Sequence, residues 1–307
     1  MLVRNTFRPC LERIEDRLTP AGNVTASGGE VLQLRGDGAD NQLRVLQEAD
    51  GRILVEGLNG TTINGRARVR FAGGLEKVDV LLFGGNDSIV FRNVVVTTDF
   101  NVETGGGRDA VALYDTRSGV VTTIKTDDGA DTVTAVRVRT GSDFNIETGQ
   151  GNSTVSVSNS AVGATLNVIG HDASDVVTVA GTTAQSDLKV FTGKGNDAVR
   201  LDGVRVGLTA TIATALGSDR VIATDVTTNE DFNVEVGEGD DVVRLTDVLS
   251  RKNIKVDAQT GNDFVGVTRV RAWSDAVFLG GDGFDTFDNN GVSGGEKLEI
   301  KEFERRI

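Results

Sequence analysis

The sequence predicts an all-β chain folded as a parallel β-solenoid, and three periodic features carry that prediction. The first is a column of aspartates. A 22-residue step from Asp87 reaches ten positions without slippage, and Ser153 alone among them is not Asp. A period held to the residue over about two thirds of the chain indicates one supersecondary unit stacked many times. The nine aspartates of this column are Asp87, Asp109, Asp131, Asp175, Asp197, Asp219, Asp241, Asp263 and Asp285.

The second feature is a pair of apolar columns with the same step. Within one unit, Phe232 and Val234 alternate with polar residues, and so do Val243 and Leu245. Alternation with period two places such side chains on one face of short strands. β-branched residues dominate both columns, as a tightly stacked interior favours. The columns are Ile124, Ile146, Val168, Val190, Ile212, Val234 and Val256, and Val111, Val133, Val155, Val177, Val199, Val221, Val243 and Val265.

The third feature is the spacing of turn residues. The Gly-x-Asp turn forms one corner, and a second lies six residues after each Asp position, where residues that tolerate a left-handed backbone prevail. Four residues further on, a weaker set of glycines marks a third corner. Three corners and three short sides in each 22-residue unit predict a three-sided coil, and parallel crossovers are nearly always right-handed. An antiparallel sandwich would not hold one period through ten units. The second-corner residues are Asn93, Asp115, Arg137, Asn159, Gly181, Gly203, Asp225, Asp247, Arg269 and Gly291.

The two ends of the chain depart from the period. Residues 77–296 hold ten 22-residue coils, which would form a rod of roughly 50 Å at about 4.8 Å per coil. Residues 23–76 contain similar Gly/Asp turns and alternating apolar residues but lack the 22-residue step, and they include a predicted β-hairpin around Asp50-Gly51. Because an open coil end exposes unpaired backbone groups, we interpret 23–76 as an N-terminal cap and the charged segment 297–307 as a closing strand.

Composition limits the partners. The formal charge is −13, which disfavours nucleic acid and favours divalent cations, basic or neutral glycans, or cell-surface components. The one cysteine, Cys10, excludes an intrachain disulfide. No stretch reaches the roughly 18 apolar residues of a membrane helix, so we expect no transmembrane segment. The sequence does not indicate an oligomeric state.

The segment 1–22 contains a distinctive polar run. Arg8-Pro9-Cys10-Leu11-Glu12-Arg13-Ile14-Glu15-Asp16-Arg17-Leu18-Thr19-Pro20-Ala21 resembles the leader-like segment that opens many large planctomycete surface and secreted proteins, although Ile14 replaces the usual Leu. The resemblance is confined to this run and implies export to the cell surface or the extracellular space. A short amphipathic helix is the alternative interpretation of the same run.

The Gly-rich turns suggest metal binding. Gly193-Lys-Gly-Asn-Asp197, Gly237-Glu-Gly-Asp-Asp241 and Gly281-Asp-Gly-Phe-Asp285 resemble haemolysin-type (RTX) calcium-binding repeats. The resemblance implies Ca²⁺ as a cofactor, held by turn carbonyls and by the nine column aspartates. Hard oxygen ligands in a tight loop suit this ion. The alternative is that each Asp accepts hydrogen bonds from the amides of its own turn.

The chain also departs from that family. The family packs two such motifs into an 18-residue coil, whereas here one turn appears in each 22-residue coil. The first Gly of the motif occurs only on alternate coils. The same 44-residue step appears in Asp99-Phe-Asn-Val-Glu103, Asp143-Phe-Asn-Ile-Glu147 and Asp231-Phe-Asn-Val-Glu235, so the array looks like a repeated two-coil unit. The alternating glycines are Gly105, Gly149, Gly193, Gly237 and Gly281.

Catalytic candidates are sparse. His171 is the one histidine, and no Ser/His/Asp or Cys/His set assembles around it. Parallel β-helices include polysaccharide lyases and hydrolases, but those need a groove wall, and no corner here has an insertion. We therefore predict a non-enzymatic, extracellular structural or adhesive rod, with a carbohydrate-active enzyme as the alternative. The outward charges that such an enzyme would use are Glu103, Glu147, Glu235, Lys125, Lys189 and Lys255, which a solvated face explains equally.

Overall fold

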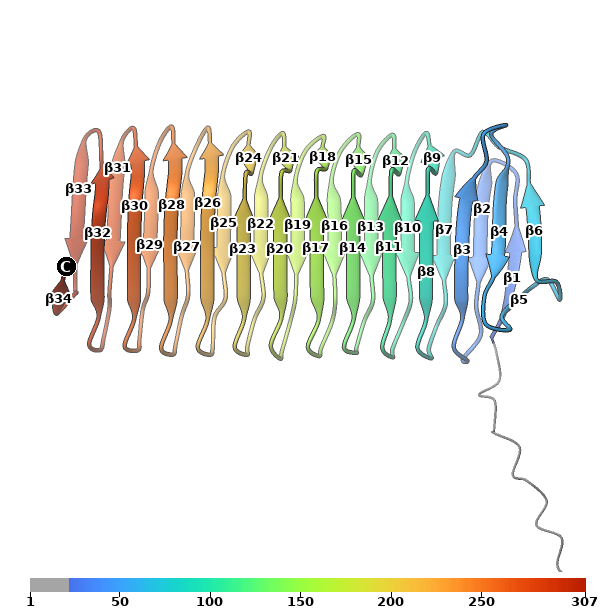
Figure 1. The fold of residues 1–307 in the computed structure, drawn as a ribbon, viewed down its shortest axis with the longest axis horizontal. Helices are drawn as coiled ribbons and strands as arrows, with labels where there is room; N and C mark the ends of the chain where they lie inside the picture. Colours follow the sequence, from blue (N-terminus) through green and yellow to red (C-terminus); the bar gives the residue numbers. More distant parts are fainter. Residues whose placement is uncertain (1–21) are drawn as a thin grey trace, which may run out of the picture.

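The computed structural model describes residues 22–307, and every regular element in that range is a β-strand. From Lys77 onward the strands stack side by side along one axis in the order of the sequence, which gives the rod seen in Figure 1. No helix in this range is long and apolar enough to cross a membrane. The predicted leader-like segment and Cys10 lie outside the described residues. The predicted parallel β-solenoid of about ten coils is confirmed.

One face of the rod is a 14-stranded sheet. Its neighbouring strands run in the order β33 (Lys297–Lys301), β31 (Asp275–Leu279), β29 (Ile254–Asp257), β27 (Phe232–Glu235), β25 (Ala210–Ala213), β22 (Leu188–Phe191), β19 (Leu166–Ile169), β16 (Phe144–Glu147), β13 (Thr122–Lys125), β10 (Phe100–Glu103), β7 (Lys77–Leu81), β2 (Val31–Arg35), β1 (Asn23–Ser27) and β5 (Thr62–Ile63).

The other face is a 20-stranded sheet built from long and short strands. The long ones are β3 (Gln42–Gln47), β4 (Ile53–Gly57), β6 (Arg68–Phe71), β8 (Ser88–Arg92), β11 (Ala110–Tyr114), β14 (Thr132–Val136), β17 (Thr154–Ser158), β20 (Val176–Ala180), β23 (Ala198–Asp202), β26 (Arg220–Thr228), β28 (Val242–Ser250), β30 (Phe264–Ala272) and β32 (Thr286–Ser293). The short ones are β9 (Val95–Val96), β12 (Arg117–Ser118), β15 (Arg139–Thr140), β18 (Ala161–Val162), β21 (Thr183–Ala184), β24 (Arg205–Val206) and β34 (Arg305–Arg306).

Each coil contributes three segments, and these segments lie in two sheets. The Gly-x-Asp turn carries the chain from the 14-stranded to the 20-stranded sheet, and the third corner returns it. All ten second-corner residues have the expected positive φ, between 51° and 97°. They bend the chain within the 20-stranded sheet, so that β8 and β9 share it, and β26, β28 and β30 run through the bend as single strands.

The register repeats with the 22-residue step. Val102 of β10 lies beside Ile124 of β13, and Val111 of β11 lies beside Val133 of β14. The two predicted apolar columns are therefore stacked, and all their members are at most 2% exposed. The interior is one continuous apolar cluster along the rod. Burial of β-branched side chains in register is the main stabilising contribution to such a stack.

The N-terminal region combines a further coil with a cover. β2 and β3 pair in parallel with β7 and β8, at a 46-residue offset in place of a 44-residue one. β3, β4 and β6 pair antiparallel, with the hairpin turn at Asp50-Gly51. At the opposite end, β33 lies parallel on β31 and β34 on β32. β5 and β33 are the terminal strands of the 14-stranded sheet.

Candidate functional site

The aspartate column lies at the start of each long strand of the 20-stranded sheet, with its side chains inside the rod. None of its ten members, Ser153 included, is more than 2% exposed. A row of carboxyl groups inside an apolar stack is costly unless each group is hydrogen-bonded. The hydrogen bonds of this column therefore determine its chemistry.

One oxygen of each carboxyl group is bonded to the neighbouring coil. The Oδ1 atom of Asp109 accepts the backbone N–H of Asp87 at 2.7 Å, and the same bond repeats along the column at 2.6–2.9 Å. At the position without Asp, the hydroxyl of Ser153 accepts the N–H of Asp131 at 3.2 Å. We call this column of bonds the aspartate ladder.

The aspartate ladder has a terminator at each end. The N–H of Asn41 donates to Asp87 Oδ1 at 2.7 Å, and the N–H of Asp285 donates to Glu304 Oε2 at 2.7 Å. As the alternative to metal binding, the sequence predicted that each Asp accepts hydrogen bonds from the amides of its own turn. The structure places the bonds between coils instead, so each carboxyl group links two coils.

The second oxygen of each carboxyl group has no hydrogen-bond partner within the described residues. The Oδ2 atoms of all nine column aspartates are buried without such a bond. Because burial disfavours the charged form, desolvation raises the pKa of every one of these groups. It raises the pKa of Asp241 to about 8, of Asp87 and Asp263 to about 7, and of Asp131 and Asp175 to about 6.

The residue five positions before each Asp lies beside this second oxygen. At Gly170, an added Cβ would come within 2.1 Å of Asp175 Oδ2. In four coils that residue is a buried threonine, whose hydroxyl lies beside the carboxyl group without a hydrogen bond to it and lowers its pKa against the effect of desolvation; the hydroxyl of Thr214 donates to the carbonyl oxygen of Val236 at 3.0 Å. The threonine–aspartate pairs are Thr104–Asp109, Thr126–Asp131, Thr192–Asp197 and Thr214–Asp219.

The alternating turn glycines have a steric cause. At Gly237, with φ of 93°, an added Cβ would lie 1.7 Å from the carbonyl oxygen of Ala215 in the preceding coil. Ala215 itself has φ of 72° and keeps its side chain. Glycine is thus required on every second coil, and the 44-residue step of the sequence reflects this packing.

The carboxyl groups of the aspartate ladder do not by themselves meet the needs of a calcium ion. Ca²⁺ takes six to eight oxygen ligands, and each coil offers one free carboxylate oxygen that faces the interior. Within residues 22–307, no group of three or more His, Cys, Asp or Glu residues could hold a metal ion. Each column carboxyl group instead accepts a backbone N–H of the neighbouring coil.

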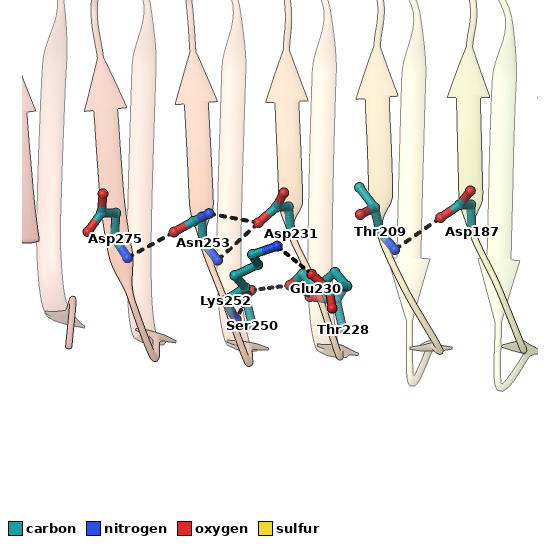
Figure 2. Close-up of polar contacts among 9 residues, drawn as sticks. All are labelled: Asp187, Thr209, Thr228, Glu230, Asp231, Ser250, Lys252, Asn253 and Asp275. Atoms are coloured by element: carbon teal, nitrogen blue, oxygen red, sulfur yellow. Dashed lines mark hydrogen bonds and ion pairs between the residues drawn. The ribbon is translucent and has the colours of Figure 1, made fainter. Parts of the chain in front are cut away.

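A second polar ladder runs at the third corner, with opposite polarity. Figure 2 shows that Asp187 Oδ1 accepts the N–H of Thr209 at 3.1 Å, in the following coil. Asp231 Oδ1 accepts the side-chain amide of Asn253 at 2.9 Å, and Asn253 accepts the N–H of Asp275 at 3.1 Å. These half-buried aspartates recur with the 44-residue step, so the two-coil unit is present here too.

The outward charges considered for an enzyme are mostly engaged with neighbours. Lys125 Nζ lies 3.2 Å from Glu147, whose other oxygen lies 3.5 Å from His171 Nε2. Lys255 pairs with Asp257 at 2.9 Å, and Lys189 lies 3.8 Å from Asp187. His171 is exposed.

Comparisons with known proteins support the fold. No family model matches the chain, and no curated protein sequence matches it. A crystal structure of a hyperactive, Ca²⁺-dependent, β-helical antifreeze protein from an Antarctic bacterium is similar, with a TM-score of 0.50 and 17% sequence identity. The similarity covers 88% of this chain and 78% of that one. It identifies a β-helical architecture.

Proposed function

We propose that this protein is a non-enzymatic, rigid rod that serves as a structural or adhesive element outside the cell or on its surface. The observation that carries the proposal is the aspartate ladder, which joins every coil from Asn41 to Glu304 through buried side chains. Side-chain bonds of this kind add to the backbone ladders of both sheets. They stiffen the array, whereas a catalytic site would need a groove on its surface.

The uniform outline of the coils supports the same proposal. Parallel pairing continues in register from β7 to β33 and from β8 to β32, and the 22-residue step holds throughout between β10 and β31. Among residues 77–296, no corner carries an inserted loop that could wall a groove. The run at residues 8–21 is the support for export.

Two measurements test this role. Antibody labelling of intact source cells should detect the rod without permeabilisation, and a screen against acidic and neutral polysaccharides should show no turnover. Detection only after lysis would contradict the location. Turnover that disappears in Glu147→Gln would establish the enzyme alternative.

That variant is chosen because one observation favours the enzyme at that place. Asp127, Asp128, Glu147 and His171 line a surface hollow of about 380 Å³. It is the one place where the histidine meets carboxylates. A matched control is Glu235→Gln, which removes the equivalent carboxylate four coils away.

Calcium remains a prediction for this chain. The turn motif and the Ca²⁺ dependence of the similar antifreeze protein support it, and the geometry of the aspartate ladder does not. From the geometry, millimolar Ca²⁺ should leave the melting temperature within about 1 °C of its value in chelator. A rise of several degrees would show that the turns bind the ion, since a ligand of the folded state stabilises it by mass action.

A further inference from the structure

We propose that one edge of the rod binds an anionic polysaccharide chain, through a row of unpaired arginines that ends at an exposed tryptophan. This inference builds on the proposed adhesive role and names its ligand. The residues are Arg117, Arg139, Arg205, Arg251, Arg271 and Trp273, which we call the arginine edge.

The arginine edge follows from the register of the coils. Arg117, Arg139, Arg205 and Arg271 occupy one position of the 22-residue unit, in β12, β15, β24 and β30. In Figure 1 these strands end along the upper edge of the rod. Seven coil steps separate Arg117 from Arg271, or about 34 Å at about 4.8 Å per step. A ligand that contacts both is therefore an extended polymer.

These guanidinium groups are free to bind. All five arginines of the edge are exposed, and none has an ion-pair partner within residues 22–307. Elsewhere on the rod, arginines such as Arg35 and Arg200 pair with nearby carboxylates. In a chain with a formal charge of −13, an unpaired row of one sign marks a binding surface for the opposite sign.

Acidic residues beside the edge do not cancel its charge. Asp115 is bound by Arg137 at 2.6 Å, and Asp247 by Arg269 at 2.5 Å. Asp225, on the same outward position as these pairs, is the one carboxylate there without a cation among residues 22–307. From the second corner to the third corner of the ten coils, the chain carries seven arginines and three aspartates.

Trp273 supplies a flat surface at the end of the row. Its side chain is 52% exposed, and the guanidinium carbon of Arg251 lies 5.7 Å from the ring centroid. The equivalent residue of the next coil is Gly295, where an added Cβ would meet the carbonyl oxygen of Trp273 at 1.8 Å. No side chain can therefore cover the ring from that coil.

Surface hollows lie along the same edge. Arg271, Trp273, Ser293 and Gly295 are among the residues that line a hollow of about 440 Å³. A second hollow of about 440 Å³ is lined by Asp115, Arg117, Arg137, Arg139 and Asn159. Each is large enough for a sugar ring, and in each at least one free guanidinium faces the space where a carboxylate or sulfate would lie. An indole face suits the apolar C–H side of such a ring.

The edge favours a polysaccharide over a nucleic acid. Single-stranded nucleic acids are bound on several aromatic platforms, because successive bases stack. The arginine edge has one aromatic side chain. In the same column of the 22-residue unit, Arg205 lies between the neutral residues Thr183 and Thr227.

The sole tryptophan makes the binding directly observable. Polygalacturonate is added to the full chain at low ionic strength, and the fluorescence of Trp273 is followed. Chelator is present throughout, so that calcium cannot bridge the acidic rod and the acidic polymer. We expect a saturable change that salt reverses, no change with dextran, and a weaker response with poly(dT).

Two triple variants of equal charge locate the site. Arg139→Gln, Arg205→Gln and Arg271→Gln together should weaken binding about tenfold, since each exposed ion pair contributes a factor of about two to five. The control combines Arg66→Gln, Arg108→Gln and Arg220→Gln, three exposed arginines away from the edge, and should change binding less than twofold. Thermal unfolding verifies that both variants fold.

Each other outcome overturns a defined part of the inference. Equal loss in both triple variants would show attraction by charge alone, without a site. Tighter binding of poly(dT) would replace the ligand class. Absence of polygalacturonate binding by the unmodified protein would refute the edge while leaving the scaffold proposal intact. New reducing ends released from the polymer would instead refute the non-enzymatic role and leave binding intact.

Discussion

Two stretches of the aspartate ladder have the same backbone geometry and different surroundings. Around Asp197 and Asp219, a buried threonine lies five residues earlier, at Thr192 and Thr214. Around Asp241 and Asp263, that position is Val236 and Ala258. The ladder bonds are alike in both stretches, at 2.6–2.8 Å.

The two stretches differ in how far the pKa of the carboxyl group is raised. The pKa of Asp241 is raised to about 8 and that of Asp263 to about 7, because desolvation has no hydroxyl to offset it. The threonine hydroxyls at Thr192 and Thr214 lower the pKa of Asp197 and Asp219 against the same desolvation. One backbone design thus raises the pKa of the carboxyl groups in both stretches, and a threonine hydroxyl opposes that rise in one of them.

The largest effect should come from pH. The folded-state pKa of each column Asp lies above its unfolded value, so the folded rod binds more protons. Its contribution to stability is full below about pH 4 and is lost as pH rises through about 6 to 8. Between pH 5 and pH 9 the free energy of unfolding should fall by roughly 10 kcal/mol. Urea titrations at each pH measure this, and higher stability at pH 9 would contradict it.

The next effect should come from removing one carboxyl group in each stretch. Asp197→Ala leaves the buried N–H of Asp175 without its acceptor and should cost about 1–3 kcal/mol. Asp241→Ala should cost less at pH 9, because it also removes a carboxylate that is expensive to ionise. The serine variants at both positions are the controls, since Ser153 already accepts a ladder bond. Equal losses in both stretches at pH 9 would show that the surroundings are irrelevant.

The smallest effect should come from exchanging the lining residue. Val236→Thr adds a hydroxyl beside Asp241 at nearly constant volume and should lower its pKa by about one unit. Thr192→Val should raise the pKa of Asp197 by a similar amount. Carboxyl ¹³C chemical shifts across a pH series report both values directly. Unchanged titration in both variants would refute the assigned role of the threonine.

The sequence largely predicts the fold, but it does not predict which groups bond the carboxyl groups of the aspartate column. The 22-residue step determines the register, because any slip would move Val111 or Ile124 out of the interior. The sequence also indicated aspartates in need of partners, yet it suggested cations or the amides of their own turns. Which amide reaches Asp109 depends on how neighbouring coils stack, and a single repeat does not contain that information.

The same 22-residue step contains two further patterns, one of threonine and one of arginine. Thr104, Thr126, Thr192 and Thr214 recur in register, which indicates a buried hydroxyl column beside the carboxyl groups. Arginine also recurs at the first residue of β12, β15 and β24, although in an acidic chain it reads as ordinary surface charge. Its lack of partners became visible only in three dimensions.

The direction of the aspartate ladder limits how such a rod can change in length. Every coil donates an amide to the next one, so a stack cut at any coil leaves an amide without its carboxyl acceptor, the role that Glu304 fills for Asp285. The alternating glycines add a parity rule, because removing one coil would set two glycine turns or two side-chain turns against each other. Duplication or deletion therefore preserves the packing only in 44-residue steps. With both termini kept constant, the rod can therefore lengthen or shorten only in steps of about 10 Å.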